Sequence, residues 1–317
     1  MNAEGLTREE CSFLRGAAAL FVVVAHYCQW YGAQTDAGIL CILLSKLGRY
    51  GVSIFFALSG YGLMCSAAKG IDVSFLSRRF QNVYVPYLFL TGIIRLFDGT
   101  EWGFGSAARW ALAIDSWFVF VILLFYILFY FVWRYCKNKM FLIWAGILLI
   151  SAALGVCTKD SAWYSCNFSF GIGIAVKAYE SQFAVFLKKY RFFPLIFLLV
   201  CFGGSAVIYM LAMNGNQAIY IGFKILASVF WTLFVFSLAV QIKFAYGKYI
   251  RRLGEASLEC YLVHPFVLAI VEQSVSFGKK WEYLGIVCIS VVCSIIISCF
   301  LHKTYSVLME IYKRKRN

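Results

Sequence analysis

The amino-acid sequence predicts an all-α fold: a polytopic membrane helical bundle of about ten transmembrane helices with both termini in the cytoplasm. Composition is the first observation behind this prediction. Of the 317 residues, 62% are hydrophobic and only 14% are charged. A soluble protein of this length needs many more charged residues on its surface, so the chain is expected to be an integral membrane protein.

Ten apolar stretches have the length of a membrane-spanning helix, about 17 to 25 residues. Of the 29 Lys and Arg residues, 21 are assigned to connections or adjoining span ends on one side of this layout and 6 to those on the other side, while Arg95 and Lys224 are assigned to neither. Cytoplasmic loops carry the excess of these residues, so an even number of spans with both termini inside is expected. The expected spans are residues 12–32, 49–68, 80–97, 116–133, 140–158, 161–178, 192–213, 220–242, 256–273 and 283–302.

The formal net charge of +14 does not indicate a nucleic-acid-binding protein. The basic residues are spread over short connections and are not gathered on one solvated face. We therefore expect a multi-pass protein of the cytoplasmic (cell) membrane, whose partners include membrane lipids and no nucleic acid. No linker divides the chain, which predicts a single membrane domain over residues 1–317, with a basic cytoplasmic tail at 303–317 and no fused extracytoplasmic domain.

The twelve cysteines lie mostly inside apolar stretches and lack metal-binding spacing. They are expected to be buried free thiols, and no metal site is predicted. Cys157 and Cys166 flank an expected outer loop, and they are the one pair for which a disulfide is considered.

Arg15 and His26 are ionisable residues within the first expected span. On a helix, two side chains eleven residues apart point within about 20° of the same direction, and they are separated by roughly 16 Å along the axis. Both side chains should face the bundle interior, because ionisable groups facing lipid are costly. Two interpretations of His26 stay open: a neutral imidazole that links two helices, or a general base. Arg15 is either an anchor for lipid phosphate or the cationic entrance to that base.

Five sequence motifs follow one another along the chain: Arg15-x10-His26, RYGVSIFFALSGYGLM (49–64), FLSRRFQNVYVPY (75–87), SWFVFVILLFY (116–126) and LGEASLECYLVHPFV (253–267). Together and in this order they resemble the motifs of the acyltransferase 3 family, integral membrane O-acyltransferases that modify cell-surface glycans in bacteria. The resemblance implies that cytoplasmic acetyl-CoA is the donor substrate, with no permanently bound cofactor. It also implies a polysaccharide or lipid-linked glycan precursor as the acceptor. In the family the Arg-x10-His pair is required for activity, which implies catalytic roles for His26, as general base, and for Arg15.

The resemblance implies a donor-binding role for Arg78, Arg79, Ser59 and Gly60. Arginine suits this role because its planar fork pairs with phosphate oxygens. Juxtamembrane arginines also bind lipid head groups, and small residues such as Ser59 and Gly60 also let helices approach closely. Family members commonly carry another arginine where this chain has Asn82.

Five further residues are acceptor-side or structural candidates: Trp117, Asp115, Glu259, Tyr261 and His264. Trp117 and His264 match family positions, whereas Asp115 and Ser116 stand where a histidine often precedes the tryptophan in the family. Trp117 is equally a membrane-interface anchor, and Asp115 is either a partner for sugar hydroxyls or simply solvated. Glu259 lies within an expected span, so it should have a partner or be protonated. His302 is expected at the cytoplasmic interface.

The leading function is therefore a membrane O-acetyltransferase. The alternative is a transporter or exporter of a polar or lipid-linked substrate that uses the same Arg and His for binding and proton coupling. A purely structural subunit is a third possibility. A homo-oligomer or a separate transfer partner is compatible with each of these interpretations.

Overall fold

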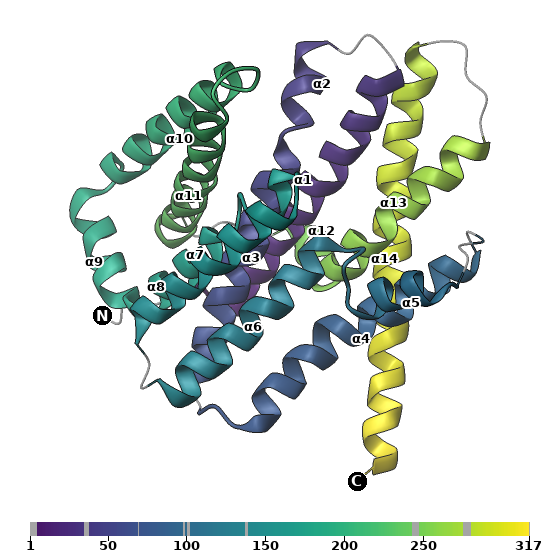
Figure 1. The fold of residues 1–317 in the computed structure, drawn as a ribbon, viewed down its shortest axis with the longest axis horizontal. Coiled ribbons are helices and arrows are strands. Elements are labelled where there is room, and N and C mark those ends of the chain that lie inside the picture. Colours follow the sequence, from purple (N-terminus) through teal and green to yellow (C-terminus); the bar gives the residue numbers. More distant parts are fainter. Residues whose placement is uncertain are drawn as a thin grey trace. The chain divides into compact units, whose positions relative to one another are not determined.

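A computed structural model describes residues 5–34, 38–68, 70–97, 99, 102–136, 139–242, 247–274 and 280–316. Within these ranges the chain is all-helical and contains no β-strand (Figure 1). The elements are α1 (Arg8–Gln34), α2 (Ile39–Leu44), α3 (Leu47–Ala67), α4 (Val73–Phe97), α5 (Phe104–Ala111), α6 (Trp117–Tyr135), α7 (Met140–Cys157), the 3-10 helix η1 (Ser161–Trp163), α8 (Phe168–Ala178), α9 (Glu180–Tyr190), α10 (Phe193–Leu211), α11 (Gln217–Gln241), α12 (Lys248–Glu255), α13 (Ser257–Ser274) and α14 (Lys280–Arg316).

In the described residues, seven helical segments are long and apolar enough to cross a membrane: Arg8–Gly32, Ile39–Ala67, Trp117–Tyr135, Met140–Cys157, Phe193–Leu211, Gln217–Gln241 and Gly285–Val307. The helix pair Lys248–Glu255 and Ser257–Gln273, bent by 82°, makes an eighth if it is one broken span. These segments coincide with eight of the ten expected stretches. The class of all-helical membrane protein is therefore confirmed, while the count of ten and the cytoplasmic termini stay predictions.

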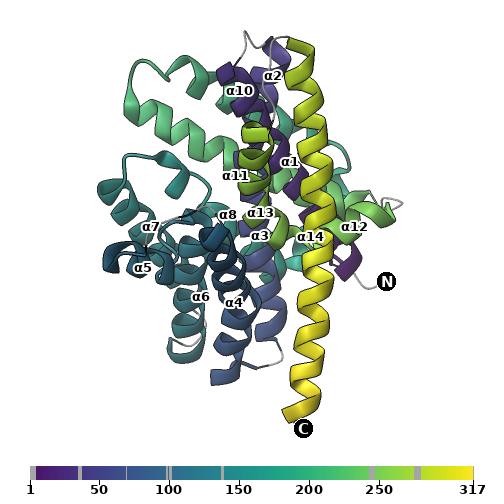
Figure 2. The ribbon, with the colours of Figure 1, turned by 90° about the vertical axis from the view of Figure 1, so that its right-hand side faces the viewer.

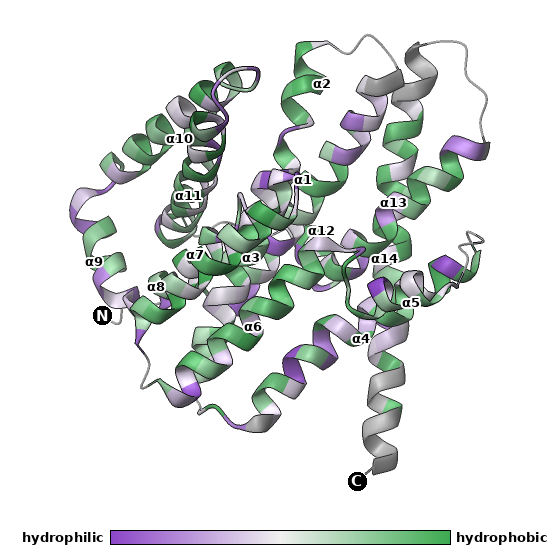
Figure 3. Cartoon of the chain, viewed as in Figure 1, coloured by the Kyte–Doolittle hydropathy of each residue, from purple (hydrophilic) through white to green (hydrophobic). Residues whose placement is uncertain are grey.

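The remaining two expected stretches differ from simple spans. Residues 80–97 lie within α4, whose N-terminal half carries hydrophilic residues, in contrast to the nearly uniform apolar surfaces of α7 and α10 (Figure 3). Residues 161–178 are not one helix, because η1 and a turn precede α8, which has only 11 residues. At about 1.5 Å per residue, α8 is much shorter than a hydrocarbon core of about 30 Å.

The disulfide considered between Cys157 and Cys166 is not formed. Both are free thiols; Cys157 is exposed at the end of α7, whereas Cys166 is buried. Residues 303–316 of the expected basic tail continue α14, which remains helical to Arg316.

The described chain forms two compact units. Unit 1 contains residues Met1–Glu10, Val52–Tyr84 and Phe104–Ala245. Its core is aromatic: the buried rings of Phe125 and Phe170 stack with their centroids 4.9 Å apart, and Phe56 meets Phe125 edge-on at 5.7 Å. Helices α10 and α11 pack along each other within this unit (Figure 1).

Close approach of α3 and α8 in unit 1 depends on two glycines. A Cβ atom at Gly60 would lie 2.2 Å from the Phe170 carbonyl oxygen, and one at Gly173 would lie 1.8 Å from the Ala57 carbonyl oxygen. Because backbone atoms cannot move aside as a flexible side chain can, larger residues at these positions would push the helices apart. Small residues allow the same close packing in membrane helix pairs generally.

Unit 2 contains residues Cys11–Gly51, Val85–Gly103 and Tyr246–Asn317. In this unit α13 packs beside the long helix α14 (Figure 2). The buried Tyr27 of α1 joins the two, because its hydroxyl lies 3.1 Å from the His264 carbonyl oxygen on α13 and 2.6 Å from the Ser294 hydroxyl on α14. These contacts fix the part of α1 that carries His26 against α13.

Candidate functional site

The first turn of α1 is fixed by a capping box. The Glu10 carboxylate accepts a hydrogen bond from the Thr7 N–H at 2.7 Å, and the Thr7 hydroxyl accepts one from the Glu10 N–H at 3.2 Å. Such reciprocal pairs satisfy N–H groups that a helix start leaves unpaired. The Leu6 N–H also donates to the Tyr61 hydroxyl at 2.9 Å. Arg8, the first residue of α1, is therefore held at a defined place in unit 1.

Arg8 lines a pocket of about 780 Å³ together with Arg78, Arg79, Ser66 and Asp72. We call this the cationic pocket. Three arginines and one aspartate are its charged lining residues among the described ones, so this charged lining is net positive. Pockets of about 300–1,000 Å³ are typical of small-molecule and cofactor sites. Arg78 and Arg79 were predicted from the sequence as donor-binding residues, whereas Arg8 was not.

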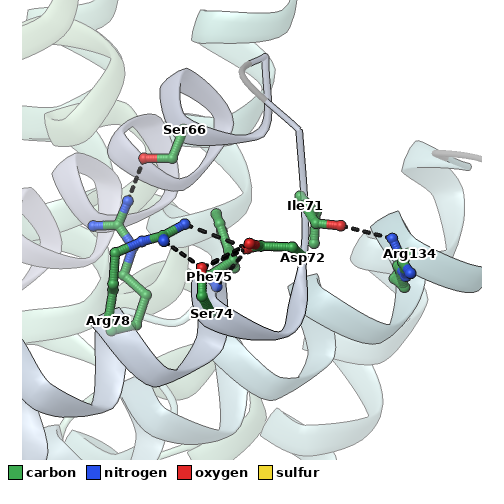
Figure 4. A network of polar contacts seen from close by, with 8 residues as sticks. Ser66, Ile71, Asp72, Ser74, Phe75, Arg78 and Arg134 are labelled. Carbon is green, nitrogen blue, oxygen red and sulfur yellow. Dashed lines mark hydrogen bonds and ion pairs between the residues drawn. The ribbon is translucent and has the colours of Figure 1, made fainter.

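Asp72 organises one side of the cationic pocket (Figure 4). It precedes α4 and caps it, accepting a hydrogen bond from the Phe75 N–H at 2.9 Å. The Ser74 hydroxyl also donates to Asp72, and the Arg78 guanidinium forms an ion pair with it at 3.4 Å. Hydrogen bonds from Ser74 and Phe75 and the nearby charge of Arg78 lower the pKa of Asp72. The carboxylate is therefore ionised at neutral pH and orients Arg78, which also donates to Ser74.

Arg79, another lining residue of the cationic pocket, is held by α3. Its guanidinium donates to the Gly62 carbonyl at 3.3 Å and to the Ser66 hydroxyl, and it lies over the Phe75 ring at 5.6 Å from the centroid. The two neighbouring arginines are thus fixed by different elements. Arg134 of α6 donates to the Ile71 carbonyl at 2.9 Å and so braces the loop between α3 and α4 (Figure 4).

Ser59 and Gly60, predicted at the donor site, lie on α3. Ser59 is half-buried and Gly60 is buried. The contact of Gly60 with the Phe170 backbone supports the packing interpretation of this residue. Gly62, two residues further along α3, has open space where a Cβ would be and lines the cationic pocket.

His26 and His264 form a hydrogen-bonded pair in unit 2. His26 Nδ1 lies 2.6 Å from His264 Nε2, and His264 Nδ1 lies 3.0 Å from the Cys260 carbonyl oxygen. His264 is 1% exposed, whereas His26 is exposed. The sequence motifs placed the two histidines 238 residues apart on separate helices, and folding joins them.

Arg15 lies on the same continuous helix as His26, eleven residues earlier, and is half-buried. The adjacent Gly16 lets α1 approach α12 closely, since a Cβ there would be 2.0 Å from the Ile250 carbonyl oxygen. The Ser12 hydroxyl reinforces this contact by donating to the Arg251 carbonyl at 2.8 Å. Packing against α12 therefore fixes the segment that carries Arg15.

Glu259 has the partner that its burial requires. One carboxylate oxygen lies 2.9 Å from His302 Nδ1, and the residue is 4% exposed. The other oxygen has no hydrogen-bond partner among the described residues, and Glu259 lines a small cavity of about 30 Å³. His302 was expected at the interface, which stays a prediction; the structure adds its pairing with Glu259, which sequence spacing could not reveal.

The other three acceptor-side candidates are more exposed than Glu259. Asp115 forms an ion pair with Arg109 at 3.0 Å. Trp117 is half-buried and meets Phe118 edge-on at 6.3 Å. Tyr261 is half-buried, with its ring centroid 6.1 Å from that of His264.

Comparison with protein families decides the classification. The model of the acyltransferase 3 family, described as an acyltransferase domain, matches residues 10–303. The chain belongs to this family. The match includes both histidines of the pair, all of the sequence motifs and every arginine of the cationic pocket except Arg8. The molecule is therefore a membrane protein of an acyltransferase family.

One curated relative is Acyltransferase MdmB from Streptomyces mycarofaciens, which is 32% identical over 114 residues. That alignment covers 33% of this chain and 30% of the relative. It therefore supports membership of an acyltransferase group over a limited part of each protein. No solved structure matches the chain.

Proposed function

We propose that the protein is a membrane O-acetyltransferase that moves an acetyl group from cytoplasmic acetyl-CoA to a hydroxyl of a cell-surface polysaccharide or its lipid-linked precursor. The observation that carries this proposal is the cationic pocket. Its arginines suit a donor that bears several phosphate groups, because the guanidinium fork pairs with two phosphate oxygens at once. Its volume of about 780 Å³ is large enough for a nucleotide.

His26 is the proposed general base. It removes the proton from the acceptor hydroxyl while the oxygen attacks the thioester carbonyl. The new C–O bond forms, the C–S bond breaks, and the proton returns from His26 to the departing coenzyme A thiolate. A neutral imidazole suits both transfers because it accepts and releases a proton near neutral pH. Arg15 is the proposed second catalytic group on α1.

Donor turnover tests this proposal directly. The purified protein in lipid nanodiscs should release free coenzyme A thiol from acetyl-CoA when an envelope extract of the native cell is supplied as acceptor. Acetyl groups should appear in the extract in equal amount. Transport of a substrate without thiol release would contradict the proposal and favour an exporter.

Replacing Arg78 by alanine should weaken donor binding. We expect the KM for acetyl-CoA to rise about tenfold with kcat changed much less, because a charge-assisted contact to phosphate is lost at a partly exposed site. The KM of Arg78→Lys for acetyl-CoA should lie between those of the wild type and of Arg78→Ala. Steady-state kinetics at varied acetyl-CoA concentration would measure the change.

Lys188→Ala is the matched control for Arg78→Ala. Lys188 is exposed on α9 and does not line the cationic pocket, so its removal changes the net charge equally without changing the pocket. Equal effects of the two substitutions on KM would show that overall charge, and not the pocket, governs donor binding.

A further inference from the structure

We propose that His264 is a positioning residue that fixes the tautomer of His26, so that the lone pair of His26 Nε2 is presented to the acceptor hydroxyl. This inference rests on the proposed role of His26 as general base. It assigns His264 a role distinct from acceptor binding or simple helix packing. The hydrogen-bond pattern around the two rings is the observation that carries it.

The assignment of hydrogens to the two rings begins at the Cys260 carbonyl. The Cys260 carbonyl oxygen only accepts hydrogen bonds, so His264 Nδ1, 3.0 Å away, must carry the hydrogen. In a neutral imidazole the other nitrogen then has a lone pair and accepts. His264 Nε2 therefore accepts from His26 Nδ1 over the 2.6 Å contact. His26 consequently carries its hydrogen on Nδ1 and has its lone pair on Nε2.

The orientation of the rings agrees with this assignment. Their planes differ by 5° and their centroids are 4.9 Å apart. The centroid separation exceeds the 2.6 Å N···N distance by about two ring radii. The hydrogen bond therefore lies in the plane of both rings, where the nitrogen lone pair also lies, and the rings do not overlap face to face.

Burial keeps His264 neutral, which the pattern requires. A charged His264 would donate a hydrogen bond from Nε2, and His26 would then have its lone pair on Nδ1. His26 Nε2 could no longer accept the proton of the acceptor hydroxyl. His264 is 1% exposed, and burying an imidazolium without a carboxylate partner is costly. Among the described residues, the hydrogen-bond partners of its ring nitrogens are a carbonyl and the other histidine, neither of which is an anion.

The backbone of His264 is also held in place. The Tyr27 hydroxyl lies 3.1 Å from the His264 carbonyl oxygen, and it is anchored to Ser294 of α14 at 2.6 Å. Tyr27 follows His26 directly in the sequence. Neighbouring residues of α1 thus contact the main chain and the side chain of the same residue on α13, which limits rotation of the pair.

Nuclear magnetic resonance of the protein in lipid nanodiscs tests the tautomer without any substrate. The chain has only three histidines, so ¹⁵N-histidine spectra of the wild type and of His26→Gln and His302→Gln variants assign each ring. We expect both His26 and His264 to carry a hydrogen at Nδ1 and to have an unprotonated Nε2. Protonation of His26 at Nε2 would overturn the inference, whatever the activity.

Kinetics test whether the tautomer matters. His264→Phe keeps a ring but removes the nitrogen that accepts the hydrogen bond from His26. We expect kcat to fall about 100-fold or more with little change in the KM for acetyl-CoA, because loss of the correct tautomer is severe in base catalysis. His264→Gln can place an amide oxygen near the former Nε2, and it should retain kcat within about tenfold of the wild type. Unchanged kcat in His264→Phe, or equal losses in both variants, would contradict the inference.

A double substitution separates positioning from an independent role. If His264 acts through His26, His264→Phe should cause no further loss of kcat in a His26→Ala background. A further loss would show that His264 contributes separately. The proposed role of His26 as general base fails in a different way, namely if His26→Ala alone retains full acetyl transfer. The proposed function itself fails if the wild-type protein releases no coenzyme A thiol from acetyl-CoA.

Discussion

His26→Ala should lower kcat for acetyl transfer about 10²- to 10⁴-fold, the range that general-base catalysis contributes. The physical reason is that the substitution removes the proposed base, which takes the acceptor proton while the thioester is attacked. Membrane insertion and thermal stability should change little, because the His26 side chain is exposed and, within the described residues, forms one hydrogen bond, to His264. Coenzyme A release and acetyl incorporation would both be measured.

His26→Gln distinguishes chemistry from packing. Its amide can still donate a hydrogen bond to His264 Nε2, so a purely structural link between α1 and α13 would survive. It cannot take up a proton, so a base would be lost. We expect His26→Gln to be nearly as inactive as His26→Ala. Activity close to that of the wild type would mean that His26 is a structural contact.

Gly60→Ala should destabilise the protein through the contact of α3 with α8. The added Cβ would lie 2.2 Å from the Phe170 carbonyl oxygen, and overpacking of this kind costs about 1–3 kcal/mol of unfolding free energy. The expected result is a lower midpoint of thermal unfolding in detergent or nanodiscs.

Gly62→Ala is the matched control, because it lies two residues away on the same helix and has no atom within 4 Å of the new Cβ. It should be neutral or slightly stabilising, since alanine favours helix over glycine by about 1 kcal/mol. If Gly60→Ala instead kept full stability but weakened acetyl-CoA binding, the donor-binding interpretation of Gly60 would replace the packing one.

The sequence was sufficient to predict the helices that are apolar along their whole length. Composition and span length identified α6, α7, α10 and α11 with bounds close to those observed. Prediction was weaker where helices are short or polar. The stretch 161–178 is apolar enough to suggest a span, but Asp160 caps a 3-10 helix through a hydrogen bond from the Ala162 N–H, and α8 begins only at Phe168.

Part of the candidate site followed from local signals. The spacing of Arg15 and His26 depends only on helix geometry, and α1 is continuous through both. The contribution of Arg8 was missed, although Thr7 and Glu10 have the spacing of a capping box and mark where α1 begins. That signal places Arg8 at the start of the helix, beside the first membrane span.

Contacts between distant segments could not be predicted from local patterns. His302 pairs with Glu259 across 43 positions, and His264 meets His26 across 238. A single sequence shows that a buried carboxylate or imidazole needs a partner, but it does not show which one, because the choice depends on how α1, α13 and α14 pack. The tautomer assigned to His26 follows only from that packing.

Mass spectrometry of the surface polysaccharide tests the central claim most directly. Native cells would be compared with cells that carry His26→Gln, with the membrane level of the protein confirmed to be equal. We expect acetyl groups on the wild-type polysaccharide and their loss, one acetyl mass per modified residue, in the variant. An identical acetylation pattern in the two strains would contradict the account.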